Sequence, residues 1–161
     1  MIRLSAFLLL LSVVAVVSCR SPEKPAVNPL PSPGPGASPA QVAGRYGGSY
    51  TFGRAFPERA GETVRFVLTL YQSPGSIHVT GTMQEDSGLG GAVTADVVGT
   101  CVSDGDVVRL RFTKKYRHSK QPVENFLGSL PPGSSLLTGI WFDAESSTGS
   151  GTFQLDGVQP R

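Results

Sequence analysis

The chain has 161 residues, a formal net charge of +2, 16% charged residues, 20 glycines and 13 prolines. A charge this close to neutral excludes the bulk electrostatic attraction that draws basic proteins to nucleic acid. Few charges and many glycines favour an exported β-domain over a helical one.

The first 18 residues have the three parts of a secretory signal: Arg3 in a short n-region, an apolar run, and a small residue at the cut. The apolar run is too short for a membrane span. Val16-Val17-Ser18-Cys19 resembles the lipobox of bacterial lipoproteins, in which an aliphatic, a permissive and a small residue precede the lipidated cysteine. The resemblance implies that Cys19 begins the mature protein and carries acyl chains that anchor it to a membrane. The alternative is an ordinary cleaved signal followed by an incidental cysteine.

Residues 19–43 are rich in proline and show no hydrophobic period, which predicts a disordered, extended tether. A proline-rich docking site is the alternative. The residue after Cys19 is Arg20, where lipoproteins retained in the inner membrane carry Asp, so we expect the outer membrane if the host has one. The predicted organisation is a signal peptide over 1–18, a tether over 19–43 and one folded domain over 44–161.

From Gly44 onward the apolar residues alternate with a period of two, and no stretch has the pattern of an amphipathic helix. The strands predicted in chain order cover residues 44–52, 62–72, 77–84, 92–102, 106–116, 123–130, 136–142 and 149–156. Short turns such as Asp104-Gly105 join most of them, which predicts an eight-stranded antiparallel up-and-down β-barrel. Glycines that recur on the inward faces suit the bends of a narrow barrel. A two-sheet β-sandwich is the alternative.

The Gly-x-aromatic segments Gly44-Arg45-Tyr46 and Gly139-Ile140-Trp141 resemble strands of the calycins, the lipocalin and avidin group. The closing stretch from Thr138 to Leu155 is similar to the final hairpin of many small bacterial barrel proteins. The first strand has Tyr where lipocalins have Trp, and the inward polar set of avidins is missing. The resemblance therefore implies a barrel fold and no particular binding residue.

No catalytic set is evident, and we expect neither an enzyme nor a cofactor. His78 and His118 have no second His, Cys or carboxylate at ligand spacing, so no metal site is expected. Cys101 lies in an alternating apolar run and should be a small buried hydrophobe. If Cys19 were not lipidated, a Cys19–Cys101 disulfide would be the alternative.

Two groups of residues are candidates for binding. The aromatic residues Tyr46, Phe126 and Trp141 could line a ligand cavity, although a lone Trp on an apolar face is more often part of the core. The second group is basic and could contact phosphate or another anionic component of the envelope, and its members are Arg109, Arg111, Lys114, Lys115, Arg117 and Lys120. Arg109, Arg111 and Lys115 should project outward together. The alternative for the basic group is a solvated strand face and loop.

These observations support a membrane-anchored lipoprotein whose barrel binds a hydrophobic or amphiphilic ligand, or an envelope partner, without catalysis. The alternative is a structural or interaction protein with a solid core and no ligand. A cavity inside the barrel would separate the two hypotheses. Nucleic acid is not an expected partner, and the sequence leaves the oligomeric state open.

Overall fold

The computed structural model describes residues 36–86, 91–117, 120–143 and 150–160, and within them the chain forms strands and turns but no helix. The strands are β1 (Ser38–Pro39), β2 (Gly44–Phe52), β3 (Thr63–Tyr71), β4 (His78–Asp86), β5 (Ala92–Asp104), β6 (Val107–Tyr116), β7 (Glu124–Leu130), β8 (Leu137–Asp143) and β9 (Gly151–Leu155).

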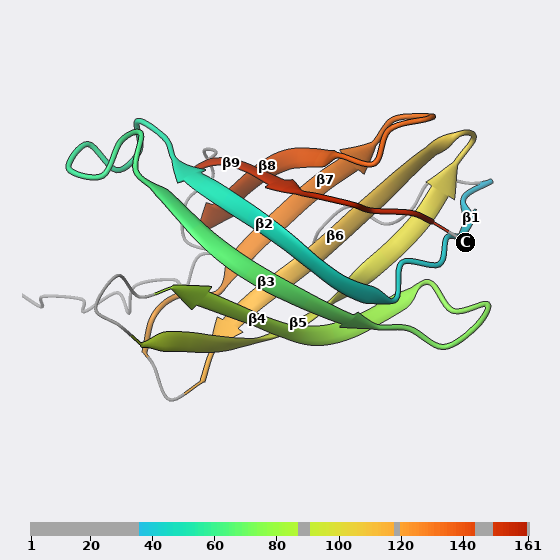
Figure 1. Cartoon of the computed structure of the whole chain (residues 1–161), viewed down its shortest axis with the longest axis horizontal. Helices are drawn as coiled ribbons and strands as arrows, with labels where there is room; N and C mark the ends of the chain where they lie inside the picture. Colours follow the sequence, from blue (N-terminus) through green and yellow to red (C-terminus); the bar gives the residue numbers. More distant parts are fainter. Residues whose placement is uncertain (1–35, 87–90, 118–119, 144–149, 161) are drawn as a thin grey trace, which may run out of the picture.

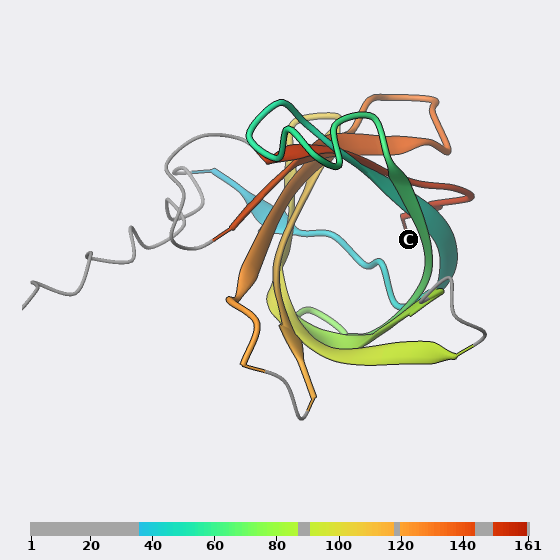
Figure 2. The same ribbon diagram turned by 90° about the vertical axis from the view of Figure 1, so that its left-hand side faces the viewer.

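All strand pairings are antiparallel, and consecutive strands from β2 to β9 are neighbours. The pairing of β2 with β9 closes this sequence into a ring, so that β2 to β9 form an eight-stranded up-and-down barrel. Figure 1 shows the barrel from the side, and Figure 2 shows the ring of strands from one end. The predicted barrel is confirmed, and the β-sandwich alternative is wrong. The strand boundaries agree with those expected from the period-two alternation to within two residues.

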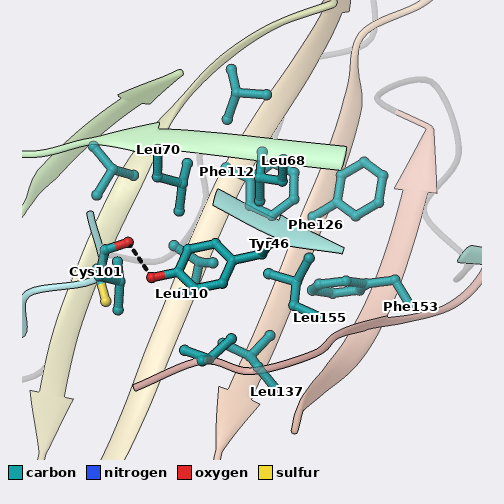
Figure 3. Close-up of a cluster of buried hydrophobic side chains, with 14 of the residues drawn as sticks. Tyr46, Leu68, Leu70, Cys101, Leu110, Phe112, Phe126, Leu137, Phe153 and Leu155 are labelled. Atoms are coloured by element: carbon teal, nitrogen blue, oxygen red, sulfur yellow. Dashed lines mark hydrogen bonds between the residues drawn. The ribbon is translucent and has the colours of Figure 1, made fainter. Parts of the chain in front are cut away.

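Alternate side chains of each strand point into the barrel, where aromatic and aliphatic residues fill the core. Figure 3 shows part of this core, where Phe112, Phe126 and Phe153 lie close to one another. The rings of Phe112 and Phe126 stack at 4.6 Å, and the edge of Phe153 meets Phe126 at 5.2 Å between centroids. Cys101 is fully buried here as a free thiol, as expected.

Glycine occupies positions where two strands approach too closely for a side chain. A Cβ atom on Gly99 would collide with the backbone oxygen of Arg111, and one on Gly139 would collide with that of Leu127. Gly48 leaves room for the ring of Phe66 inside the barrel. The inward glycines therefore permit the tight coiling of the sheet, as their distribution in the sequence suggested.

The folded unit begins earlier than the Gly44 boundary predicted from the sequence. β1 pairs with the end of β5, and the segment after it crosses one end of the barrel (Figure 2). Ala40 and Val42 are buried there, and the Val42 amide donates to Gln72 Oε1 at 2.8 Å. The last residues of the predicted tether are therefore part of the domain. Proline content alone concealed this, because Pro39 lies on a short edge strand, where proline is tolerated.

The two ends of the barrel differ. One end is closed by the segment from β1 to Val42 and by Val158 near the C-terminus. The opposite end, which we call the mouth, is formed where β2, β4 and β6 finish and where β3, β5 and β7 begin. Figure 1 shows β1 at the end away from the mouth, so the chain enters the barrel from the closed end.

Candidate functional site

A hollow of about 560 Å³ opens at the mouth, and we call it the mouth hollow. Its lining includes Tyr50, Arg59, Arg65, Glu85, Val93 and Tyr116. The alternation of β2, β4 and β6 turns Tyr50, Glu85 and Tyr116 toward the barrel axis, so these three side chains lie between the hollow and the apolar core. Arg59 comes from the loop between β2 and β3, where its guanidinium lies 3.7 Å from the centroid of the Phe52 ring.

Beneath the hollow lies a buried charged cluster, which we call the mouth cluster: Lys114, Glu85, Glu124, Tyr50 and Tyr116. The Lys114 side chain is fully buried, and its Nζ lies 2.6 Å from Glu85 Oε1 and 2.6 Å from Glu124 Oε2. Glu85 lies on β4, which is separated from β6 by β5. Glu124 lies on β7, the neighbour of β6 on its other side. Two carboxylates therefore surround one ammonium group inside the barrel wall.

Two tyrosines complete the cluster. The Tyr116 hydroxyl donates to Glu85 Oε2 at 2.6 Å and accepts from Lys114 Nζ at 2.7 Å, and the Tyr50 hydroxyl donates to the same Glu85 oxygen at 3.3 Å. The Lys114 ammonium also lies 4.7 Å and 4.4 Å from the ring centroids of Tyr50 and Tyr116, which is within cation–π range. Burial raises the pKa of both hydroxyls, so they remain protonated donors.

The surroundings of Glu124 disfavour the charged form of its carboxyl group. Burial raises the pKa of its carboxyl, while Lys114 opposes the rise through its charge and hydrogen bonding, and Glu85 and Asp143 add to it. An acid held above its ordinary pKa beside a second carboxylate can exchange a proton in response to its surroundings. The cluster therefore places a carboxyl group with a raised pKa beneath an open hollow.

The prediction that Lys114 belongs to the basic group that contacts an anionic surface is wrong, because its side chain is fully buried. The predicted strand 106–116 already contained Lys114, and the alternation along β6 turns this side chain inward, on the same face as Phe112. Buried inside the barrel, it cannot contact an anionic surface. Glu85 and Glu124 were missed for a related reason. They share the inward faces of Met83 and Phe126. Glu85 lies just beyond the predicted strand 77–84, whereas Glu124 lies within the predicted strand 123–130, where the alternation already turns it inward.

The remaining basic residues lie outside the barrel, but they do not form one continuous free patch. Arg109 pairs with Asp104 at 3.1 Å and Arg117 pairs with Asp96 at 2.6 Å. Lys115 is exposed, as expected, whereas Arg111 is half-buried. Lys120 is exposed in the connection after β6, and His118 lies outside the described residues.

Tyr46, Phe126 and Trp141 belong to the packed core and do not line the mouth hollow. The Tyr46 hydroxyl donates to the Val42 carbonyl at 2.8 Å at the closed end (Figure 3), and Phe126 is fully buried. Trp141 is 2% exposed, and its Nε1 donates to the Thr51 carbonyl at 3.1 Å. Trp141 is therefore a core residue.

The predicted lipidation site Cys19 lies outside the described residues. In the part of the chain that the structure describes, no helix has the length and apolar character needed to cross a bilayer. The same residues contain no group of three or more His, Cys, Asp or Glu side chains that could hold a metal ion. His78 is exposed on the outer face of β4.

The pairing order, an eight-stranded antiparallel up-and-down barrel, is consistent with the calycin-like barrel that the sequence resembles. Comparison with known proteins finds no family model, no curated protein and no solved structure that matches this chain, so its fold is assigned from topology alone.

Proposed function

We propose that this protein is a lipid-anchored, non-catalytic binding protein of the bacterial cell envelope. Its ligand is a small amphiphile with a positively charged head group, and the site is the mouth hollow. The observation that carries this proposal is the position of the mouth cluster, because an open hollow ends on buried carboxylates that outnumber the ammonium between them.

The charges around the hollow favour a cationic head group. The charged side chains in the hollow or directly beneath it are the carboxylates Glu62, Glu85, Asp86 and Glu124 and the cations Arg59, Arg65 and Lys114. Arg59 is already held by Glu62 at 2.6 Å, and Lys114 is already held between its two partners. The site has an excess of one negative charge, and the apolar side chains of Val64 and Val93 line the same hollow beside it.

A purely structural role does not account well for the mouth cluster. Removing two carboxylates and an ammonium from water is costly, and apolar residues of similar volume at such positions often give equal or greater stability. Charged groups of this kind below an open hollow are typical of binding sites, where they orient a polar group.

The second candidate function is an interaction protein without a small ligand. The packed interior favours it, since the aromatic residues that would line a central cavity contact one another instead. In that case the loops and outer face would bind an envelope partner.

Calorimetric titration of the full chain with octylamine and with octanol separates the two functions. The tails are identical, so binding of octylamine at least ten times tighter than octanol would reflect the head group. Glu85→Gln should abolish this preference while retaining the β-sheet circular dichroism spectrum. Glu58→Gln is the control, because Glu58 is exposed in the same loop as Arg59 but does not line the hollow. Equal binding of the two compounds would refute the charged site, and binding of neither would leave the second candidate.

The lipid anchor has its own test. Cys19→Ser should release the protein from the membrane fraction and abolish labelling with a palmitate analogue. Cys101→Ser is the matched control, because the Cys101 thiol is buried in the barrel and burial raises its pKa to about 12. A Cys19→Ser protein that still fractionates with membranes would contradict the anchor. Since the chain enters at the closed end, an anchored barrel would direct its mouth away from the membrane.

A further inference from the structure

A second hollow, of about 300 Å³, lies on the outer surface of the barrel across β6, β7 and β8, and we call it the side hollow. Its side-chain lining consists of Arg109, Arg111, Leu127, Ser129, Thr138 and Ile140, and the paired glycines Gly128 and Gly139 also contribute to it. It is separate from the mouth hollow, with which it shares no residue.

The strand register arranges these side chains in two adjacent rows. Arg109, Ser129 and Thr138 are cross-strand partners in one row. Arg111, Leu127 and Ile140 are partners in the other row. One row of the side hollow is therefore polar, with a guanidinium and two hydroxyls. The adjacent row has a second guanidinium, that of Arg111, beside two apolar side chains.

Arg111 has a feature that the fold does not explain. Its Nη1 atom is buried from solvent, yet it makes no hydrogen bond to any described residue. Arg109, two residues away on the same face, is held by Asp104 at 3.1 Å, so the two arginines are not equivalent. Buried charged donors are almost always paired, so a turn of the Arg111 side chain toward the side hollow would let this donor reach an acceptor from outside the chain.

We propose that the side hollow binds a phosphorylated saccharide, with its phosphate held by Arg111. The planar guanidinium matches phosphate oxygens in a two-pronged arrangement and is less strongly hydrated than an ammonium group. The hydroxyls of Ser129 and Thr138 lie in the same hollow and can donate to the remaining phosphate oxygens.

A neighbouring hollow supplies the place for the sugar. It has a volume of about 460 Å³ and shares Ser129, Thr138 and Ile140 with the side hollow. Beyond these residues its lining continues over β9 and β2 with the hydroxyl and amide side chains of Ser49, Thr51, Thr152 and Gln154. Hydroxyl and amide groups of this kind can exchange hydrogen bonds with the ring hydroxyls of a saccharide, whereas a lipid tail would leave them unpaired.

The test is titration of the full chain, in a detergent that contains neither sugar nor phosphate, with glucose 6-phosphate, inorganic phosphate and glucose. Glucose 6-phosphate should bind at least ten times more tightly than either fragment, and its affinity should fall as salt rises because the contact is ionic. Arg111→Gln should weaken it at least tenfold without lowering the melting temperature, since the Nη1 group makes no hydrogen bond within the described chain. Arg111→Lys should recover only part of the affinity, because an ammonium lacks the planar fork.

Arg45→Gln is the matched control, since Arg45 is an exposed arginine on the outer face of β2 and lines neither hollow. It should bind glucose 6-phosphate as the unchanged protein does. Equal affinity for phosphate and glucose 6-phosphate would refute the saccharide, and absence of binding would refute the site. Equal weakening by Arg45→Gln would also refute it, as would binding to phosphatidylglycerol vesicles without binding to glucose 6-phosphate. Glu85→Gln should leave this affinity unchanged, which separates the result from the fate of the mouth hollow.

Discussion

The Lys114 ammonium pairs with two carboxylates at once, those of Glu85 and Glu124. It lies within 2.6 Å of both, and no part of the Lys114 side chain is exposed. The free energy of this arrangement depends on all three charges, because removal of the cation leaves two buried carboxylates next to each other.

Lys114→Met should therefore lower the free energy of unfolding by about 3–5 kcal/mol, the range for breaking a buried ion pair. Urea denaturation at neutral pH measures the change. Lys115→Met is the control, because the next side chain along β6 is exposed and should change stability by less than about 0.5 kcal/mol. Equal effects of the two substitutions would show that the ion pairs contribute nothing specific. Adding Glu85→Gln and Glu124→Gln to Lys114→Met should recover most of the loss.

Glu124 gives the stability a predictable dependence on pH. Its pKa is raised in the folded protein, mainly by burial, so the folded state holds this proton more tightly than the unfolded state. The stabilisation of the folded state that protonated Glu124 provides is fully present below the ordinary pKa of the carboxyl. That contribution is lost as the pH rises from the ordinary pKa through the raised one.

Glu124→Gln removes this titration. Urea denaturation at a series of pH values from 4 to 7 should show the variant gaining stability relative to the unchanged protein as the pH rises, with no further gain above the raised pKa. Glu58→Gln, at an exposed position, should show no such trend. A relative gain that grows toward acid pH would mean that pairing with Lys114 outweighs burial.

At the scale of the strands, the shape of the barrel depends on positions where a side chain cannot fit. β5 and β6 approach so closely at Gly99 that a Cβ atom would collide with the Arg111 backbone oxygen and crowd the Phe112 side chain. The backbone cannot yield there without disturbing the ladder between the two strands.

Gly99→Ala should therefore destabilise the protein by about 1–3 kcal/mol, the usual cost of overpacking. Gly47→Ala is the control on β2, because a Cβ atom there would meet nothing within 4 Å. It should be neutral or stabilising by less than about 1 kcal/mol, since alanine restricts the unfolded chain. Thermal denaturation of both variants measures the difference, and equal losses would show that close approach of the strands is not the cause.

The strand pattern was the most predictable feature of the chain. The alternation Tyr46, Tyr50 and Phe52 identifies β2 and its buried face, and the boundaries of the following strands were close to correct. The errors lie at strand ends. Glu85 was placed in the connection after its predicted strand, because a charged residue ends an apolar run in the sequence even when the strand continues. Lys114 lay inside its predicted strand but was assigned to the basic group because of its charge.

At the scale of the whole molecule, the closed end joins the beginning of the domain to its core. Val42 is 1% exposed, its amide is bonded to Gln72, and its carbonyl accepts from Tyr46. The segment before Gly44 therefore covers one end of the barrel, and the chain enters the domain at that end.

Val42→Asp should lower the free energy of unfolding by about 3 kcal/mol or more, because it buries a carboxylate in an apolar contact. Ala43→Asp is the control, since the next residue is exposed. Thermal denaturation compares the two. A tolerated Val42→Asp would restore the boundary at Gly44 and make the segment before it a simple tether.

The sequence by itself determined the fold class, the number of barrel strands and the inward face of each one, because a period of two along the chain is a local property. The short turns between successive strands determined their order in the same way. Only the tertiary structure decided which charges meet. Glu85, Lys114 and Glu124 come from three separate strands, and the register of these strands brings the Lys114 ammonium within 2.6 Å of each carboxylate. This meeting depends on the registers of three successive strand pairs taken together, which no single local pattern contains.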